Sequence, residues 1–304
     1  MAEVVAFGEC MVEVGLTGPS TAALGFAGDT FNTAVYLRRQ GFTTAYGTTL
    51  GEGDPFSAGI LRLMEEEGIE ADLVRRAPGR LPGLYAIERD ASGERRFFYW
   101  RAEAPAREYF AAADLDAVGQ AMRAARLVYV SGVTLAIIGG AGRAALLDLL
   151  AGARAAGAAV GYDPNHRPPL WERVEQARAA TDAIAPLCTY LSASAADLEG
   201  LYGQAWELNP AAWAEAGVEV LLRDAAHAVT VRSAEGSVRI APGPPARALD
   251  TTGAGDAFNA GYLAARLRGR DVRASVAAAR RLSGVVVQHV GAIIPRGATP
   301  KVAS

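Results

Sequence analysis

Short apolar runs alternate along the chain with longer segments in which apolar positions recur at helical spacing. Residues 4–8 and 127–131 have the length and the β-branched content of buried strands, whereas residues 29–40 and 55–67 have the helical period. This alternation predicts an α/β fold with a mostly parallel sheet sandwiched by helices. The further strands that we expect are residues 45–49, 160–163, 189–192, 218–223 and 229–231, and the further helices are residues 140–156, 195–202, 210–216, 257–267 and 272–289.

One segment interrupts the alternation of strands and helices. Two extended runs within residues 83–101 flank the polar stretch 90–94, which is the signature of a β-hairpin. A small sheet inserted in an α/β domain is typical of a lid over a ligand or of a flap that joins two subunits. We therefore predict a single α/β domain over residues 1–304, with an inserted β-sheet lid made of residues 11–17 and 81–103.

The second run of the hairpin is rich in aromatic side chains. Strand alternation places Phe97, Tyr99 and Arg101 on one face and Phe98 and Trp100 on the other. A two-stranded ribbon cannot bury both faces by itself, so we expect one face to cover a ligand or a partner subunit. This predicts a homo-oligomer formed through the lid. For Phe98 and Trp100, simple packing on the body of the domain is an equally open alternative.

Composition narrows the class of protein. Hydrophobic residues make up 51% of the 304 positions and charged residues 21%, which is enough apolar material for a large core. The net charge of −3 argues against nucleic acid as the main partner. The first residues lack the basic region of a signal peptide, and their apolar run is too short to span a membrane. Because the two cysteines, Cys10 and Cys188, lie far apart, we expect a cytoplasmic protein without a membrane partner.

Lysine is nearly absent from the chain. Lys301, close to the carboxyl terminus, is the only one in the sequence. A P-loop nucleotide triphosphatase and a protein kinase each need a lysine within the fold, so both classes are excluded, as is a catalytic Schiff base. Any phosphate must therefore be bound by backbone N–H groups and by arginine.

Residues 250–256 form the most informative motif. Their sequence, Asp-Thr-Thr-Gly-Ala-Gly-Asp, directly precedes a predicted helix. The small residues Gly253, Ala254 and Gly255 leave backbone N–H groups free at the positive end of the helix dipole, where they can bind a phosphoryl oxygen. A carboxylate at Asp256 makes sense beside a phosphate if it accepts the proton of an attacking hydroxyl, which predicts phosphoryl transfer to an alcohol. The alternative is an ordinary helix cap with an acidic first turn.

A second polar loop follows the predicted strand 160–163. Asp163, Asn165 and Arg167 occupy alternate positions, and they point the same way if the loop is extended. Asn165 and Arg167 could then bind a sugar hydroxyl or a carboxylate, while Asp163 orients them or helps to hold water on a metal ion. A salt-bridged turn without a ligand is an equally open alternative.

A third polar segment starts the helix predicted at residues 29–40. Gly28 and Asp29 precede the helical run, and Asp29 has the chemistry of an N-cap. Asn32 then lies in the first turn, at the same edge of the sheet, where its amide can recognise a hydroxyl group.

Several separate segments share the pattern of one enzyme family. They are Gly8-Glu9-Cys10-Met11, Gly28-Asp29-Thr30-Phe31-Asn32-Thr33, Leu81-Pro82-Gly83-Leu84-Tyr85, Tyr99-Trp100-Arg101, Asp163-Pro164-Asn165-His166-Arg167, Leu170-Trp171, the motif at 250–256 and Gly291-Ala292-Ile293-Ile294-Pro295. On these segments the chain resembles the ribokinase-like (phosphofructokinase-B) sugar kinases over nearly its full length. Within that family it is most similar to the 2-dehydro-3-deoxygluconate kinases.

The resemblance implies ATP as the phosphoryl donor, Mg²⁺ as the working ion and a sugar acid as the acceptor. It implies Asp256 as the general base that activates the terminal hydroxyl, with residues 253–255 as the anion hole. The substrate contacts that we expect are Gly28, Asp29, Asn32, Tyr85, Tyr99, Arg101, Asn165, Arg167 and Asp256. The nucleotide contacts that we expect are Ser194, Arg223, Thr252, Gly253 and Gly255, with Asp163 and Asp197 holding Mg²⁺ through water.

The chain departs from the family pattern on the nucleotide side. Ser194-Ala195-Ala196-Asp197 stands where the family has Asn-x-x-Glu, and residues 224–228 lack the glycines usual near the nucleotide. Two alternatives therefore stay open: another sugar kinase of the family, acting on fructose, ribose or a different sugar acid, and a catalytically impaired sugar-acid-binding protein. The intact Asp256 argues against the second, because a binding protein does not need the base.

Overall fold

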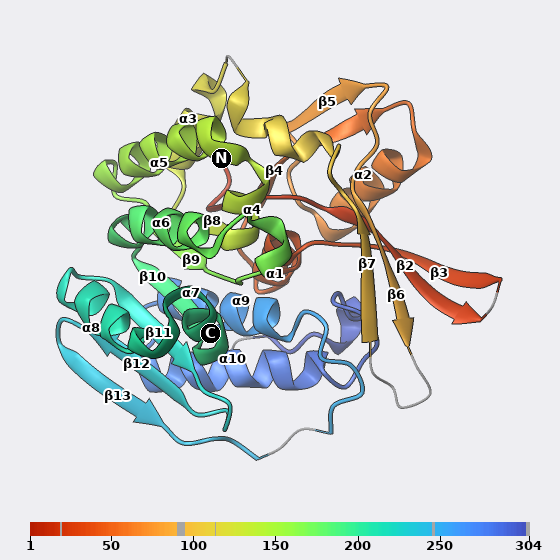
Figure 1. The fold of residues 1–304 in the computed structure, drawn as a ribbon. Coiled ribbons are helices and arrows are strands. Elements are labelled where there is room, and N and C mark those ends of the chain that lie inside the picture. Colours follow the sequence, from red (N-terminus) through yellow and green to blue (C-terminus); the bar gives the residue numbers. More distant parts are fainter. Residues whose placement is uncertain (19, 90–94, 113, 245–246, 302–304) are drawn as a thin grey trace.

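A nine-stranded sheet forms the centre of the described part of the chain, with helices on both faces (Figure 1). This computed structural model describes residues 1–18, 20–89, 95–112, 114–244 and 247–301, so the polar stretch 90–94 of the expected hairpin lies outside the described residues. The strands of the main sheet are β1 (Val4–Phe7), β4 (Thr44–Glu52), β5 (Val74–Pro78), β8 (Leu127–Ser131), β9 (Ala159–Asp163), β10 (Tyr190–Ser194), β11 (Glu219–Arg223), β12 (Val229–Ser233) and β13 (Gly236–Ile240).

The main sheet is parallel except at one edge. Its strand order is β13-β12-β11-β10-β9-β8-β1-β4-β5, and the pairs β11–β12 and β12–β13 are antiparallel. From β1 the chain first adds β4 and β5 on one side and then returns to add β8 to β11 on the other. The strand order therefore reverses between β1 and β8, and in sheets of this kind ligands bind at the carboxyl ends of the strands beside such a reversal.

The helices bury both faces of the sheet, as the alternation of the sequence predicts. Along β1, Val4 and Ala6 face one apolar cluster, while Val5 and Phe7 face the other, because successive side chains of a strand point to opposite faces. The helices are α1 (Asp29–Arg39), α2 (Pro55–Glu67), α3 (Asp116–Ala124), α4 (Gly132–Ile137), α5 (Gly139–Ala155), α6 (Val174–Ile184), α7 (Ala195–Tyr202), α8 (Leu208–Glu215), α9 (Ala254–Leu267) and α10 (Val272–Val286).

The two apolar clusters divide the helices between the faces. Side chains of α1, α2, α9 and α10 pack in the cluster that contains Val4, and side chains of α3, α5, α6, α7 and α8 pack in the cluster that contains Val5. None of the helices in the described residues is long and apolar enough to cross a membrane.

Local capping explains why some boundaries agree with the sequence. The helix expected at residues 55–67 is confirmed at both ends. Asp54 accepts hydrogen bonds from the N–H groups of Phe56 (3.0 Å) and Ser57 (2.8 Å), Pro55 stands at the first helical position, and Gly68 closes the helix with a φ of 68°. In contrast, the strands β5 and β13 and the helices α3, α4 and α6 were not expected from the sequence.

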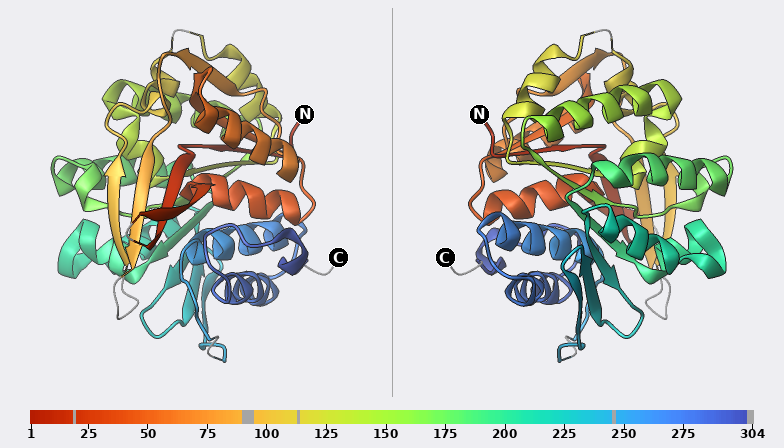
Figure 2. Two further views of the ribbon diagram at one scale, coloured as in Figure 1. Left: turned by 90° about the vertical axis from the view of Figure 1, so that its right-hand side faces the viewer. Right: turned by 90° about the vertical axis from the view of Figure 1, so that its left-hand side faces the viewer.

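A second, smaller sheet lies outside the main sheet. It has four strands in the order β3-β2-β6-β7: β2 (Met11–Gly18), β3 (Thr21–Ala27), β6 (Leu84–Arg89) and β7 (Arg95–Trp100). Strands β2 and β6 pair in parallel, and the other pairs are antiparallel. We call this sheet the lid. It projects from one side of the body in Figure 1 and faces the viewer in the left view of Figure 2.

The lid contains the strands expected within residues 11–17 and 81–103, and it also contains β3, which the sequence analysis missed. The signal of β3 is weak because Ala22, Ala23 and Gly25 give it little of the β-branched content of a strand. The division into a single domain over residues 1–304 with an inserted lid stays a prediction.

Candidate active site

Two helix N-termini meet where the polar motifs of the sequence come together. Helices α1 and α9 lie side by side in Figures 1 and 2. At their first turns, Asn32 of α1 donates a hydrogen bond from Nδ2 to Oδ2 of Asp256 in α9, at 2.8 Å. Thr33 Oγ1 also donates to the main-chain oxygen of Asp256, at 3.4 Å. The residues expected to recognise a hydroxyl and to deprotonate it are thus in direct contact.

Helix α9 begins earlier than the sequence suggested. It was expected from residue 257, but it starts at Ala254, so Asp256 lies inside its first turn. Gly253 is the N-cap with a φ of 72°, and a Cβ there would lie 2.8 Å from the Ala292 oxygen, so only glycine fits. The Ala254 N–H is engaged by the Thr251 oxygen at 3.2 Å. The N–H groups of Gly255 and Asp256 are therefore the first-turn donors that can bind an anion.

The buried carboxylate of Asp250 holds residues 250–255 at the start of α9, which we call the anion loop. It accepts hydrogen bonds from the Thr252 N–H (2.9 Å), the Thr252 hydroxyl (2.6 Å) and the Gly291 N–H (3.0 Å). The Thr252 hydroxyl, which we expected to contact the nucleotide, thus donates to Asp250 in this structure. Asp250 connects the anion loop to the segment after α10 and fixes its shape.

Asp256 has the electrostatics of a general base. Its side chain is partly exposed to the site, and desolvation raises its pKa well above the ordinary range of a carboxyl group. The negative charges of Asp29 and Asp163 raise the pKa further, whereas the hydrogen bond from Asn32 and the positive charge of Arg167 lower it. A carboxylate with a raised pKa is a stronger base than a solvated one, which suits proton abstraction from a hydroxyl group.

Asp163 is the centre of a second buried group beside α9. Its Oδ2 accepts hydrogen bonds from Asn259 Nδ2 (2.7 Å) and from Arg223 Nη2 (3.2 Å). Burial raises the pKa of Asp163, and the charge of Arg223 opposes this rise. Arg223 also lies against the anion loop, because a Cβ on Gly255 would be 3.4 Å from its Nη1. A guanidinium group therefore stands beside the first-turn N–H donors.

Asn259 is a site residue that the sequence analysis missed. Besides Asp163 it contacts the hydroxyl of Tyr129 at 3.1 Å, and its own Oδ1 is buried without a hydrogen-bond partner. The signal was present in the sequence, because Asn259 follows Asp256 by three residues and helical spacing puts the two on neighbouring positions of one face.

The loop after β9 is not extended, so one prediction about it was wrong. Asn165 has a φ of 36°, and this turn sends the three polar side chains in different directions. Asp163 points into the interior, Arg167 is exposed, and Asn165 Nδ2 donates to Asp29 Oδ2 at 2.8 Å. Asp29 is also not the N-cap of α1, since Gly28 occupies that position and Asp29 is the first helical residue.

Ser194 and Asp197 cap helix α7. Ser194 Oγ accepts the Asp197 N–H at 3.0 Å and donates to Asp197 Oδ2 at 2.5 Å, while Asp197 Oδ1 accepts the His166 N–H at 2.9 Å. The charge of Asp197 also raises the pKa of Asp163, so the two carboxylates act on one another. Mg²⁺ prefers oxygen ligands and keeps several of its waters, and the expectation that Asp163 and Asp197 hold it through water stays a prediction. The described residues contain no group of three or more His, Cys, Asp and Glu that could hold a metal ion.

Two lid residues expected to contact the substrate have carboxylate partners. Arg101 Nη2 donates to Glu9 Oε2, and the hydroxyl of Tyr85 donates to Glu13 Oε2. Tyr85 is buried, with its ring 5.8 Å from that of Tyr99, whereas Tyr99 itself is half exposed. The lid therefore presents Tyr99 to solvent and keeps Tyr85 behind it.

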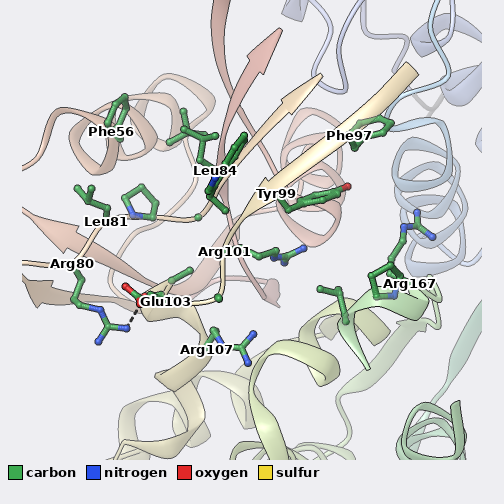
Figure 3. A pocket seen from close by; sticks show the side chains of 18 of the residues that line it. Phe56, Arg80, Leu81, Leu84, Phe97, Tyr99, Arg101, Glu103, Arg107 and Arg167 are labelled. Carbon is green, nitrogen blue, oxygen red and sulfur yellow. Dashed lines mark hydrogen bonds between the residues drawn. The ribbon is translucent and has the colours of Figure 1, made fainter. Parts of the chain in front are cut away.

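A large cavity of about 1150 Å³ lies between the lid and the body (Figure 3). Tyr99, Arg101, Arg107 and Arg167 line it, and Figure 3 shows Arg101 and Arg107 extending in the direction of Arg167. Asp256 is not among the lining residues, although its pKa responds to the charge of Arg167. The cavity thus offers guanidinium groups for an anionic ligand, and Arg167 is the lining residue whose charge acts on the base.

Comparisons with known proteins show the family of the chain. The model of the pfkB family of carbohydrate kinases matches residues 1–298. The 2-dehydro-3-deoxygluconokinase of Dickeya dadantii is 38% identical over 304 residues, covering 96% of this chain and 97% of that protein. The enzyme of the same name from Escherichia coli K12 is 37% identical over 307 residues, covering 98% and 99%.

A solved structure shows the same fold. The fructokinase with bound ATP from Xylella fastidiosa superposes with a TM-score of 0.81 at 21% identity, covering 99% of this chain and 96% of that one. The expected fold class, a mostly parallel sheet sandwiched by helices with a small β-sheet beside it, is confirmed. The match to the family model covers nearly the whole chain, and the relatives are similar over their full length, so the chain belongs to the pfkB family of carbohydrate kinases.

Proposed function

We propose that this enzyme transfers the terminal phosphoryl group of ATP to the 6-hydroxyl of 2-dehydro-3-deoxygluconate. The observation that carries the proposal is the contact of Asn32 with Asp256 at the start of α9. Arg101 and Arg167, which line the cavity, supply the positive charge for an acidic acceptor. The names of the relatives support the acceptor, and the fructokinase crystallised with ATP supports the donor.

Asp256 acts as the general base in the proposed reaction. Asn32 binds its Oδ2, so Oδ1 is the oxygen that takes the proton of the sugar hydroxyl. As the proton leaves, the hydroxyl oxygen attacks the terminal phosphorus atom of ATP, and the bond from that phosphorus to the bridging oxygen breaks, so that ADP leaves. The raised pKa of Asp256 makes its ionised carboxylate a stronger base than a solvated one.

The start of α9 stabilises the phosphoryl group. The N–H groups of Gly255 and Asp256 point at the anion, with the helix dipole behind them, and Arg223 adds a full positive charge. The only lysine of the sequence is Lys301, near the carboxyl terminus, so these donors bind the phosphate oxygens that a lysine binds in other kinases. When bound, Mg²⁺ neutralises phosphate charge, and Asp163 and Asp197 would hold it through water.

The carboxylate of the acceptor is bound by arginine. Arg101 and Arg167 line the cavity from the lid and from the loop after β9, respectively. Planar guanidinium groups suit a carboxylate, since they can donate two parallel hydrogen bonds. Asn165 and Asp29 pair with one another next to the base and can orient a hydroxyl of the sugar.

A coupled ATP-consumption assay over a panel of sugars tests the proposal. We expect the highest kcat/KM with 2-dehydro-3-deoxygluconate, lower values with other six-carbon sugar acids, and much lower values with fructose and ribose. Higher kcat/KM with a neutral sugar would contradict the acceptor and favour another kinase of the family. Sugar-acid binding in calorimetry without ATP consumption would favour an impaired binding protein.

We also propose that a second copy of the chain covers the outer face of the lid. Leu16, Leu24 and Phe98 are 44%, 59% and 39% exposed, although each is large and apolar. Such a group of exposed side chains is typical of a contact surface.

The cytoplasmic location inferred from the two isolated cysteines stays a prediction.

Light scattering measures the oligomeric state. We expect the native protein to be larger than one chain, and we expect Leu24→Asp to be monomeric because a charge in an apolar interface is left unpaired. Leu208→Asp is the matched control, since Leu208 is 72% exposed on α8, in the body. A monomeric native protein, or an unchanged mass for Leu24→Asp, would refute the lid interface.

A further inference from the structure

A buried ion pair joins the end of the lid to the body. Arg101 follows β7, and Glu9 lies in the loop between β1 and β2, where the chain leaves the main sheet. The side chains of Arg101 and Glu9 are only 9% and 2% exposed. Breaking such a pair leaves a charge buried without a partner, which is far more costly than losing a pair on the surface.

Two glycines make room for Glu9. A Cβ on Gly28 would lie 2.0 Å from the Glu9 main-chain oxygen, and a Cβ on Gly83 would lie 2.3 Å from Glu9 Oε1. The same Cβ on Gly83 would lie 3.1 Å from Cβ of Arg101. No other residue fits at either position without moving Glu9. Glycine at positions 28 and 83 therefore leaves the space that Glu9 and Arg101 occupy where the lid joins the body.

Arg101 faces the cavity, and Glu9 stands behind it. Arg101 and Gly83 line the cavity, whereas Glu9 is not among the lining residues. Glu9 Oε1 and Arg101 Nε are both buried without a hydrogen-bond partner, so the Oε2–Nη2 contact is the hydrogen bond that fixes the guanidinium. Desolvation raises the pKa of Glu9, and the charges of Arg101 and Arg107 lower it.

We propose that Glu9 is a positioning residue that orients Arg101 for the carboxylate of the sugar acid. The inference rests on the proposed function, in which Arg101 contacts that carboxylate. An arginine side chain has several rotatable bonds, and ordering them costs binding free energy. Glu9 holds the guanidinium in one orientation before the substrate arrives, so less ordering is left to be done on binding.

A double-mutant cycle tests whether Glu9 acts through Arg101. We expect Glu9→Gln to raise KM for the sugar acid by about 10-fold, as for the loss of a charge-assisted hydrogen bond, with kcat unchanged. Glu9→Asp keeps the charge and should recover part of the affinity. In an Arg101→Gln background, Glu9→Gln should have no further effect on KM, because the group that it orients is gone.

Glu67→Gln is the matched control. Glu67 pairs with Arg39 at 2.7 Å, with side chains that are only 9% and 4% exposed. Arg39 ends helix α1, about 15 Å along the helix from Asp29 at 1.5 Å per residue. We expect Glu67→Gln and Glu9→Gln both to lower the thermal unfolding temperature, but only Glu9→Gln to change KM.

Several outcomes would overturn the inference. They are an unchanged KM in Glu9→Gln, an equal rise of KM with and without Arg101, and the same rise in Glu67→Gln. If Glu9→Gln does not fold, Glu9→Asp enters the same cycle, and an equal rise in both backgrounds again overturns it. The proposed function fails separately, when the native enzyme shows no ATP consumption that depends on a sugar acid.

Discussion

Asp256→Asn is expected to lower turnover by about 10²–10⁴-fold, the usual contribution of a general base, and to leave sugar-acid binding nearly intact. Asparagine has the size of aspartate, and its amide oxygen can still accept the hydrogen bond from Asn32, which is 2.8 Å long in the native protein. The geometry of the site therefore persists, but the proton of the hydroxyl has no acceptor. Steady-state kinetics give kcat, and calorimetry with the sugar acid gives the dissociation constant.

The fold of this variant is checked by thermal unfolding. A carboxyl group whose pKa is raised in the folded state costs stability at any pH above that pKa, and the cost falls as the pH drops through it. Asparagine removes the cost, so Asp256→Asn should be at least as stable as the native enzyme at neutral pH. Asp148→Asn, on an exposed position of α5, should keep native turnover. Near-native turnover in Asp256→Asn would contradict the role of Asp256 as the general base.

Arg101→Ala is expected to raise KM for sugar acids by about 10- to 100-fold, the range for hydrogen bonds to a charged group. For a neutral sugar of the same chain length, KM should change little, because no carboxylate is present to lose its partner. The KM for ATP should also stay near the native value, since the anion loop at α9 is separate from the lid. The measurement is the ratio of the two sugar KM values in native and variant enzyme.

Arg80→Ala is the control for this comparison. Arg80 lines the same cavity, but it pairs with Glu108 at 3.1 Å and its side chain is 36% exposed. We expect its removal to affect both classes of sugar weakly. An equal rise of KM for acidic and neutral sugars in Arg101→Ala would show that Arg101 supports the lid and does not recognise a carboxylate.

The predicted fold class was confirmed. It could be predicted from local patterns because the residues that favour each strand or helix lie within that strand or helix. Strand β8 and helices α2 and α7 have the boundaries that the apolar pattern and the capping residues indicate. Ser194 and Asp197, which the sequence analysis assigned to the nucleotide and to Mg²⁺, are spaced by three and cap α7 in the structure. The start of α9 was placed late, since glycines rarely begin a helix by propensity alone.

The candidate site was only partly accessible from the sequence. The residue types at the loop of residues 250–256 and at Asn165 indicate phosphoryl transfer and sugar recognition by their chemistry alone. Their partners were not visible, because Asn32 and Asp256 are 224 positions apart and Glu9 and Arg101 are 92 positions apart. No spacing rule connects residues at such separations.

By itself, the sequence determined the alternation of strands and helices, the family, and the chemistry available at the turn before α9, because all of these depend on residues close together in the chain. Only the tertiary structure decided which side chains meet. Asn32 donates a hydrogen bond to the base Asp256, and Asp163 accepts hydrogen bonds from Arg223 and Asn259. Arg101 donates a hydrogen bond to Glu9. The physical reason is that these contacts join residues far apart in the chain, and only the packing of the helices and the lid around the main sheet, a property of the whole chain, brings them together.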